Sequence, residues 1–104
     1  MLTITNDDFA ALVDSGITIV DVREPHEYVN GHVAGAVTIP LAFVGARSAE
    51  LPKGEPIYVI CQGGGRSRVG VDVLVAQGFD AINVEGGTGA WVKAGRPVVV
   101  GPTA

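Results

Sequence analysis

The sequence predicts an α/β domain with a largely parallel sheet and helices on both faces. Short runs of β-branched and apolar residues, typical of buried strands, alternate along the chain with segments of helical spacing. The run at 17–22 is apolar almost throughout, as expected for an interior parallel strand. Because strands and helices alternate, the sheet is expected to be largely parallel, with helices on both of its faces.

Residues 1–104 are expected to form one domain. A chain of 104 residues has room for one core, and 47% hydrophobic with 17% charged residues is typical of a compact globular domain. The net charge of −4 and the pI near 4.9 argue against nucleic acid or an anionic membrane as the main partner. With Cys61 as the single cysteine and only His26 and His32 besides, no internal disulfide, no metal and no other cofactor is expected.

The first residues carry Asp7 and Asp8 where a signal peptide would need a basic start and an apolar run. No segment is long enough and apolar enough to span a bilayer. The sequence therefore predicts a cytoplasmic protein in a reducing environment.

The first half of the chain predicts three strands, each followed by a helix. Gly and Pro mark the boundaries, since Pro suits the first turn of a helix and Gly suits its end. The expected elements are a strand at 2–4, a helix from the cap at 5–8 to Gly16, a strand at 17–22, a short helix from Pro25 to Gly31, a strand at 35–40 and a weak helix at 41–50.

The second half predicts two more strands and the longest helix. Valine is frequent in that helix, so packing rather than intrinsic propensity must stabilise it. The expected elements are a strand at 56–60, a helix from about Arg68 to Gly78, a strand at 79–84, a short helix around 90–94, and either an edge strand or an apolar tail at 98–100.

A glycine-rich loop follows the strand at 56–60, and the other predictions are organised around it. Cys61 is followed by Gln62, then by Gly63, Gly64 and Gly65, and then by Arg66 and Ser67. Three glycines allow the backbone to curl so that successive amides point toward one anion. Ser67 is expected to cap the following helix, whose N-terminus would add positive potential, and Arg66 supplies a full charge for an oxyanion.

Cys61 is predicted to be a nucleophile. Amide donors, a helix N-terminus and a nearby guanidinium all favour thiolate over thiol, so its pKa should be lowered. A buried structural cysteine is the alternative, which the glycines and Arg66 directly after it make less favourable. In open sheets ligands bind beyond the carboxyl ends of the strands, where Cys61 falls.

Other candidate residues are expected to have mainly structural roles. Asp21 and Arg23 follow a strand expected to neighbour the loop, and we expect them to support the site, with Asp21 accepting hydrogen bonds. Gln62 is either a substrate contact or a solvent-facing loop residue. His32 is expected to be a structural histidine, because a thiolate already favoured by its surroundings needs no base.

Three separated stretches of the chain resemble the signatures of the rhodanese family. Residues 20–24, with Glu27-Tyr28 and the segment 31–36 after them, look like its first signature. Residues 61–67 look like its active-site loop, and Gly86-Gly87 with Trp91 resembles its closing motif. The resemblance extends from about residue 3 to about residue 98.

The resemblance implies a five-stranded parallel sheet and sulfurtransferase activity. Cys61 would take sulfur from a donor such as thiosulfate, hold it as a persulfide and pass it to cyanide, a thiol or a protein acceptor. The loop residues Gln62 to Ser67 would bind the anionic donor and leaving group. Many family loops carry arginine directly after the cysteine, whereas this chain has Gln62, so the preference for thiosulfate is in question.

Three other functions remain as alternatives. Phosphatases and arsenate reductases with related loops place five residues between cysteine and arginine, whereas four separate Cys61 from Arg66, and no second cysteine is present to resolve a reductase. Non-catalytic binding or regulatory modules of the family usually lack the cysteine. A persulfide carrier serving a dedicated protein is not distinguished from a free enzyme by sequence.

Overall fold

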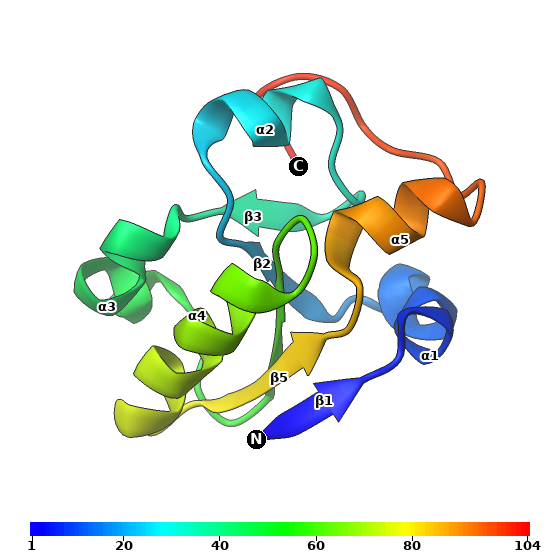
Figure 1. Cartoon of the computed structure of the whole chain (residues 1–104). Coiled ribbons are helices and arrows are strands. Elements are labelled where there is room, and N and C mark those ends of the chain that lie inside the picture. The colour runs from blue at the N-terminus through cyan, green and yellow to red at the C-terminus, as the bar shows by residue number, and fades with distance from the viewer.

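The computed structural model describes residues 1–104 and consists of one five-stranded parallel sheet, in the order β1-β5-β4-β2-β3, with helices on both faces (Figure 1). This confirms the predicted fold class. The strands are β1 (Leu2–Ile4), β2 (Thr18–Asp21), β3 (Ala36–Thr38), β4 (Pro56–Ile60) and β5 (Asp80–Val84). The helices are α1 (Asn6–Leu12), α2 (Pro25–Asn30), α3 (Val44–Arg47), α4 (Gly65–Ala76) and α5 (Gly87–Lys93).

Strand β4 is the centre of the sheet, and both of its faces are buried. Ile57 and Val59 point into the core under α3 and α4, whereas Tyr58 and Ile60 point into the core under α1, α2 and α5. This alternation follows from the two-residue period of a strand, and it accounts for the continuous apolar run in the sequence. Cys61, the next residue along the chain, joins the α4 side of the core.

The two helical layers are held mainly by apolar burial. Val71 and Leu74 of α4 pack on one face of the sheet, and Phe9, Tyr28 and Trp91 pack on the other. Burial of such side chains contributes about 1.5–3 kcal/mol each. The helical termini follow the sequence prediction at several points: Thr5 caps α1 by accepting a hydrogen bond from the Asp8 N–H, and Pro25 occupies the first turn of α2.

The strand register brings three segments together at one edge of the sheet. Asp21 of β2 lies level with Ile60 of β4, and Val59 lies level with Asn83 of β5. The residues that follow β2, β4 and β5 therefore emerge side by side at the carboxyl ends of these strands. The active-site loop, the Asp21–Arg23 segment and the start of α5 meet there.

Three local predictions differ from the structure. Residues 41–50 form α3 between two short 3₁₀ turns rather than one weak helix, and α5 begins at Gly87 rather than near Ala90. Residues 98–100 agree with the predicted apolar tail, one of the two alternatives, and Val99 makes one isolated bridge to His32. The third difference, the start of α4, belongs to the active-site loop and is described below.

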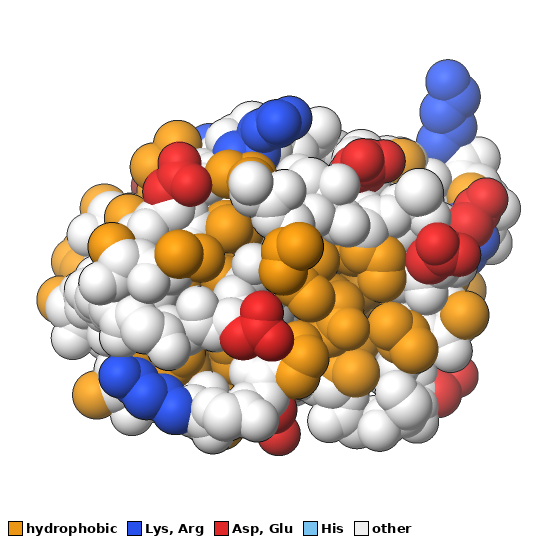
Figure 2. Space-filling model, turned by 90° about the horizontal axis from the view of Figure 1, so that it is seen from below, with side chains coloured by type: hydrophobic (Ala, Val, Ile, Leu, Met, Phe, Trp, Pro, Cys, Tyr) orange, Lys and Arg blue, Asp and Glu red, His pale blue; other side chains and the backbone are white.

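The opposite end of the molecule carries an exposed apolar surface. Seen from below, hydrophobic side chains gather around acidic ones on this face (Figure 2). A shallow hollow there is lined by Met1, Leu2, Val75, Phe79 and Ala81 together with Asp80. It lies at the amino ends of β1 and β5, the end of the sheet opposite to the one that carries Cys61.

Candidate active site

The loop between β4 and α4 is shorter than the sequence predicts. Helix α4 begins at Gly65, so only residues 61–64 lie between strand and helix. Gly64 is the N-cap residue, with φ of +106°, a left-handed conformation that glycine adopts without a Cβ penalty. The prediction that Ser67 caps a helix starting near Arg68 is therefore wrong: Ser67 lies inside the first turn and is fully buried.

Cys61 is buried, with 1% of its surface exposed, and its sulfur is surrounded by donors. The Gly64 N–H donates to Sγ at 3.0 Å, and the Ser67 hydroxyl oxygen lies 3.3 Å from Sγ. Burial raises the pKa of the Cys61 thiol, but hydrogen bonds from the Ser67 hydroxyl and from the amides of Ser67, Gly64 and Gly63 outweigh it. The net pKa of the Cys61 thiol is lowered, as the sequence predicts.

Ser67 connects Cys61 to strand β5. Its Oγ lies 2.5 Å from Asn83 Oδ1 and 3.0 Å from the Gly64 carbonyl oxygen. A hydroxyl has one proton to donate, so a thiol at Cys61 leaves Ser67 donating to Asn83 or Gly64, whereas a thiolate competes for that proton. Sequence analysis missed Asn83; its signal was an amide side chain within an otherwise apolar strand.

The loop carbonyls are held by the start of α5, which leaves the amides free to face the sulfur. The Thr88 N–H donates to the Cys61 carbonyl at 2.8 Å, and the Gly89 N–H donates to the Gln62 carbonyl at 2.9 Å. A Cβ on Gly87, whose φ is +58°, would lie 2.3 Å from the Cys61 carbonyl oxygen. This close approach explains why position 87, within the segment that resembles the closing motif of the family, is a glycine.

Asp21 and Arg23 form a buried ion pair beside the loop. The Arg23 guanidinium donates to the Asp21 carboxylate at 2.8–3.1 Å, and the Arg23 N–H donates to the same carboxylate at 3.0 Å. Nη1 donates to the Gln62 side-chain oxygen at 3.1 Å, and Nη2, which also binds Asp21, donates to the Gly31 carbonyl at 2.9 Å. The pair therefore links β2 and the end of α2 to the active-site loop, an arrangement that agrees with a supporting role.

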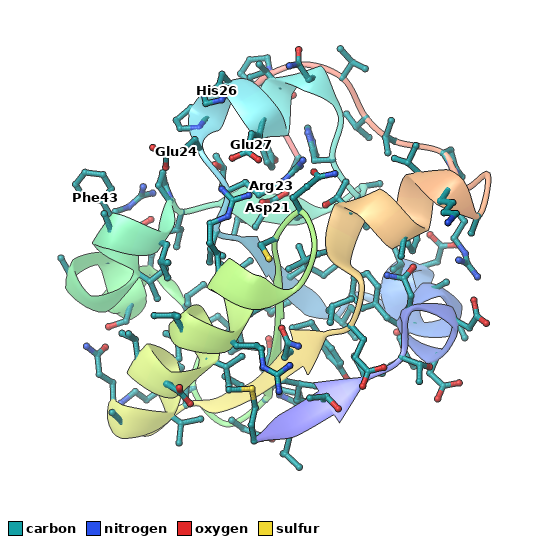
Figure 3. All side chains as sticks on the ribbon, viewed as in Figure 1. Asp21, Arg23, Glu24, His26, Glu27 and Phe43 are labelled. Atoms are coloured by element: carbon teal, nitrogen blue, oxygen red, sulfur yellow. The ribbon has the colours of Figure 1, made fainter.

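Arg66 is paired with a carboxylate rather than free for an anion. Its two terminal nitrogens donate to the two oxygens of Glu27 at 2.6 and 2.9 Å. In Figure 3, Glu27 extends from α2 toward Arg23 and Asp21, on the loop side of that helix. The charge of Arg66 still interacts with Cys61, because a Cys61 thiolate raises the pKa of Arg66, but the lowering of the Cys61 pKa comes mainly from Ser67 and the loop amides.

Glu27 is the second residue that sequence analysis missed as part of the site. Besides binding Arg66, its carboxylate accepts the Glu24 N–H at 3.1 Å in a capping box at the start of α2. Hydrogen bonding to Arg66 lowers the pKa of Glu27 from 4.5 to about 2 despite the opposing effect of burial. The pattern Glu24-x-x-Glu27 next to Pro25 was the available signal, although it predicts only a helix start.

A cavity of about 470 Å³ opens beside the loop, between α2, α5 and the C-terminal segment. Its lining includes Arg23, Glu27, Gln62, Thr88 and Val98. Thr88 is 2% exposed, and its hydroxyl oxygen has no hydrogen-bond partner. The cavity is therefore lined by both polar and apolar groups, and Gln62, the residue after Cys61, is part of its lining.

The remaining candidate residues are structural or lie away from the sulfur. His32 is fully buried, its ring stacks on Tyr28 at 3.7 Å, and both ring nitrogens lie within 2.9 Å of backbone carbonyls, as expected of a structural histidine. His26 is exposed on α2, and Arg68 is exposed on α4.

No three His, Cys, Asp or Glu side chains lie close enough together to hold a metal ion. None of the helices has the length and apolar character needed to cross a lipid bilayer.

Comparison with known proteins gives one consistent result. The family model of the rhodanese-like domain matches residues 5–94. The putative sulfur carrier protein YrkF of Bacillus subtilis is 42% identical over 79 residues, which cover 75% of this chain and 43% of that protein. The thiosulfate sulfurtransferase GlpE of Actinobacillus pleuropneumoniae is 34% identical over 86 residues, which cover 82% of this chain and 80% of that protein.

Solved structures agree with the fold. The crystal structure of a rhodanese-related protein from Thermoplasma volcanium matches with a TM-score of 0.89 and 32% identity, covering 95% of this chain and 98% of that one. This chain spans less than half the length of the Bacillus YrkF protein.

Proposed function

The chain belongs to the rhodanese-like domain family, and from this premise we propose that it is a sulfurtransferase acting through a persulfide on Cys61. The donor carries a sulfane sulfur, of which thiosulfate is the simplest example, and the acceptor is cyanide or a thiol, including a thiol on a protein. The observation that supports this most directly is the Cys61 sulfur held under the Gly64 amide at 3.0 Å with a lowered pKa.

The first half-reaction loads Cys61. Its thiolate attacks the outer sulfur of thiosulfate, a bond forms between the two sulfurs, and the sulfur–sulfur bond of the donor breaks. The electron pair of that bond leaves with sulfite, and the outer sulfur remains on Cys61 as a persulfide anion. The charge is −3 before and after the step, and no external oxidant or reductant is needed.

The second half-reaction regenerates the Cys61 thiolate. A thiolate or cyanide attacks the outer sulfur of the persulfide, and the thiolate of Cys61 departs. The products are a new persulfide or thiocyanate, so one cysteine suffices because the second nucleophile is external.

The loop amides stabilise the anions along this route. We assign Gln62, Gly63, Gly64, Gly65 and Ser67 to the cradle around the sulfur, and we assign Arg66 to the edge of the site, where its charge is shared with Glu27. Preorganised donors of this kind act on developing negative charge without reorganising. Asp21 and Arg23 hold the loop through Gln62.

A persulfide carrier that serves a dedicated protein is the second candidate. Its support is the relationship to YrkF, which is named a putative sulfur carrier protein. The two functions differ in whether small donors or a protein donor load Cys61 faster, and parallel loading kinetics with both kinds of donor would separate them. Both functions need Cys61 as a free thiol. Thiols stay reduced in the cytoplasm, so we propose that the protein is cytoplasmic.

The test is intact-protein mass spectrometry of the wild type and Cys61→Ser after exposure to thiosulfate and, separately, to a thiol hydropersulfide. We expect the wild type alone to gain one sulfur atom and to lose it to cyanide or a dithiol. Loading of the serine variant, or no loading of the wild type by either donor, would contradict the proposal. An aryl phosphate hydrolysed through Cys61 instead would favour the phosphatase alternative.

A further inference from the structure

The Ser67 hydroxyl has more acceptors around it than it has protons. Its oxygen lies 3.3 Å from Cys61 Sγ, 3.0 Å from the Gly64 carbonyl oxygen and 2.5 Å from Asn83 Oδ1. A hydroxyl carries one proton, so only one of these three acceptors can receive it fully at a time. Because Ser67 is fully buried, the surrounding protein groups decide which acceptor that is.

The charge on Cys61 decides which acceptor is strongest. A thiolate is a charged acceptor, and hydrogen bonds to charged groups are stronger than those to neutral carbonyl oxygens. Burial raises the pKa of the Cys61 thiol, and among the contacts that oppose this effect the hydrogen bond with the Ser67 hydroxyl lowers the pKa most. In the reacting thiolate, the Ser67 proton therefore belongs on the sulfur.

An Asn83 oxygen that faces Ser67 is incompatible with this thiolate state. Once the Ser67 proton points at Sγ, the oxygens of Ser67 and Asn83 would face each other at 2.5 Å with no proton between them. Rotating the Asn83 amide by half a turn places Nδ2 there instead, and its N–H can donate to the Ser67 oxygen. The oxygen and the nitrogen of an amide have nearly the same size, so the rotation needs no repacking.

The surroundings of Asn83 permit this rotation. Its side chain is 2% exposed and its amide nitrogen makes no hydrogen bond within the protein, so only the bond to Ser67 has to be exchanged. Asn83 also lines a cavity of about 320 Å³, together with the loop glycines, Arg68 and Glu85. The unpartnered nitrogen is not fully enclosed, and after the rotation the oxygen takes its place, where solvent can donate to it.

We propose that Asn83 is a positioning residue for the reaction at Cys61: its side-chain amide rotates to donate to Ser67 whenever Cys61 is a thiolate, which directs the Ser67 proton at the sulfur. The proposal rests on Cys61 as the reacting sulfur of the function proposed above. When the thiol ionises, its proton leaves to solvent, whereas Ser67 keeps its own proton and changes only the acceptor. Asn83 makes no hydrogen bond to Cys61, so it acts through Ser67.

The charged groups around Cys61 make no hydrogen bond to its sulfur. Helix α5 carries only Lys93, at its last residue, and Arg66 interacts with Cys61 through its charge. The others at this end of the sheet are Asp21 and Arg23 after β2, Glu27 on α2, Arg68 on α4 and Glu85 after β5. Replacement of the neutral Asn83 by a neutral residue leaves all of these charges in place, so a change in the ionisation of Cys61 then reports the hydrogen bonds.

The first test is Asn83→Leu, which keeps the approximate size of the side chain and removes both its donor and its acceptor. The rate of alkylation of Cys61 by iodoacetamide is measured as a function of pH; since Cys61 is the single cysteine, the rate reports its thiolate alone. The Gly64 carbonyl can replace the lost acceptor for the Ser67 proton, but no group replaces the lost donor. The thiolate therefore loses more than the thiol does.

We expect the midpoint of the pH profile to move to higher pH in Asn83→Leu, so that alkylation at mildly acidic pH slows by about tenfold. The limiting rate at high pH should change by less than about twofold, whereas a loss of packing alone would alter that limit and not the midpoint. If the Asn83 oxygen only accepted the Ser67 proton, its removal would free that proton for the sulfur and move the midpoint down. A lower or unchanged midpoint would overturn the proposal.

Two matched variants test whether Asn83 acts through Ser67. Ser67→Ala should raise the midpoint by itself, and adding Asn83→Leu to it should cause no further change. A further change of the same size would overturn the assignment. Thr38→Val removes a buried hydroxyl without a partner at the end of β3, level with Asp21, and should leave the midpoint unchanged. A shift in this control as large as that of Asn83→Leu would also overturn it.

Nuclear magnetic resonance of the wild type gives a test that needs no stable Asn83 variant. The chain has three asparagines, Asn6, Asn30 and Asn83, so selective ¹⁵N labelling gives three side-chain amide groups to follow. One Hδ2 proton of Asn83 should move downfield with the midpoint of Cys61 alkylation, and this movement should be lost in Cys61→Ser. No movement with that midpoint would overturn the proposal.

The two proposals fail separately, because alkylation and amide signals need no sulfur donor. Loading of Cys61 by a donor together with an unmoved midpoint in Asn83→Leu would leave the sulfurtransferase function and remove the role of Asn83. A raised midpoint without loading of the wild type by any donor would retain the control of the Cys61 thiolate by Asn83 and contradict the sulfurtransferase function.

Discussion

Two ion pairs flank the active-site loop, and they differ mainly in burial. The side chains of Arg23 and Asp21 are 3% and 0% exposed, whereas those of Arg66 and Glu27 are 39% and 24% exposed. In Figure 3, Glu27 lies on the loop side of α2, above Arg23 and Asp21, while Glu24, His26 and Phe43 lie on the outer surface. Both pairs join the segment after β2 to the loop that carries Cys61 or to the helix that follows it.

The difference in burial separates their roles. A buried charge that loses its partner is strongly destabilising, so the Asp21–Arg23 pair fixes the geometry of the loop through Gln62 and Gly31. A half-exposed pair contributes little to stability and can exchange partners. The Asp21–Arg23 pair is therefore the fixed support of the loop, whereas the Arg66–Glu27 pair, whose Glu27 lines the cavity, can rearrange.

The largest effect is expected for Asp21→Asn. The substitution leaves the Arg23 guanidinium buried without a counter-charge, which should lower the free energy of unfolding by about 3–5 kcal/mol. Urea denaturation followed by circular dichroism measures this loss. A loss no larger than that of Glu27→Gln would remove the distinction between the two pairs.

A smaller effect is expected for Arg23→Lys. Lysine keeps the charge beside Asp21 but cannot reach Asp21, Gln62 and Gly31 together, so about 1–2 kcal/mol of hydrogen bonding should be lost. Because the loop loses its anchor at Gln62, alkylation of Cys61 by iodoacetamide should change as well. Unchanged stability together with unchanged alkylation would show that Arg23 does not position the loop.

The smallest effect on stability is expected for Glu27→Gln, about 1 kcal/mol at neutral pH. The pKa of Glu27 is lowered from 4.5 to about 2 on folding, so its stabilisation is complete above pH 4.5 and is lost as the pH falls toward 2. The difference in unfolding free energy between wild type and variant should therefore shrink on acidification below pH 4.5. A difference that stays constant, or that grows in acid, would contradict this pairing; Glu50→Gln serves as the control for general charge effects.

Sequence patterns predicted the parts of the structure that depend on neighbours along the chain. The alternation of apolar runs and helical segments identified the five strands, Pro25 marked the start of α2 and Gly78 the end of α4, whereas Gly16 follows a 3₁₀ turn that comes after the end of α1 at Leu12. The position of Cys61 after the central strand followed from the same pattern. The start of α4 was placed three residues too late, because a serine is the usual helix cap and the left-handed Gly64 that replaces it leaves no distinctive local signal.

The sequence by itself determined the α/β class, the central strand, the single cysteine and the glycine loop that supplies its amides, since these depend on local composition and period. Only the tertiary structure decided that Ser67 meets Asn83, that the start of α5 binds the loop carbonyls, and that Glu27 occupies Arg66. These contacts join residues 16 to 39 positions apart in the chain, and their partners are set by strand order and register rather than by local spacing. The sequence identifies which side chains are charged. Whether such a charge is paired with an opposite charge depends on which element packs against it in the folded protein.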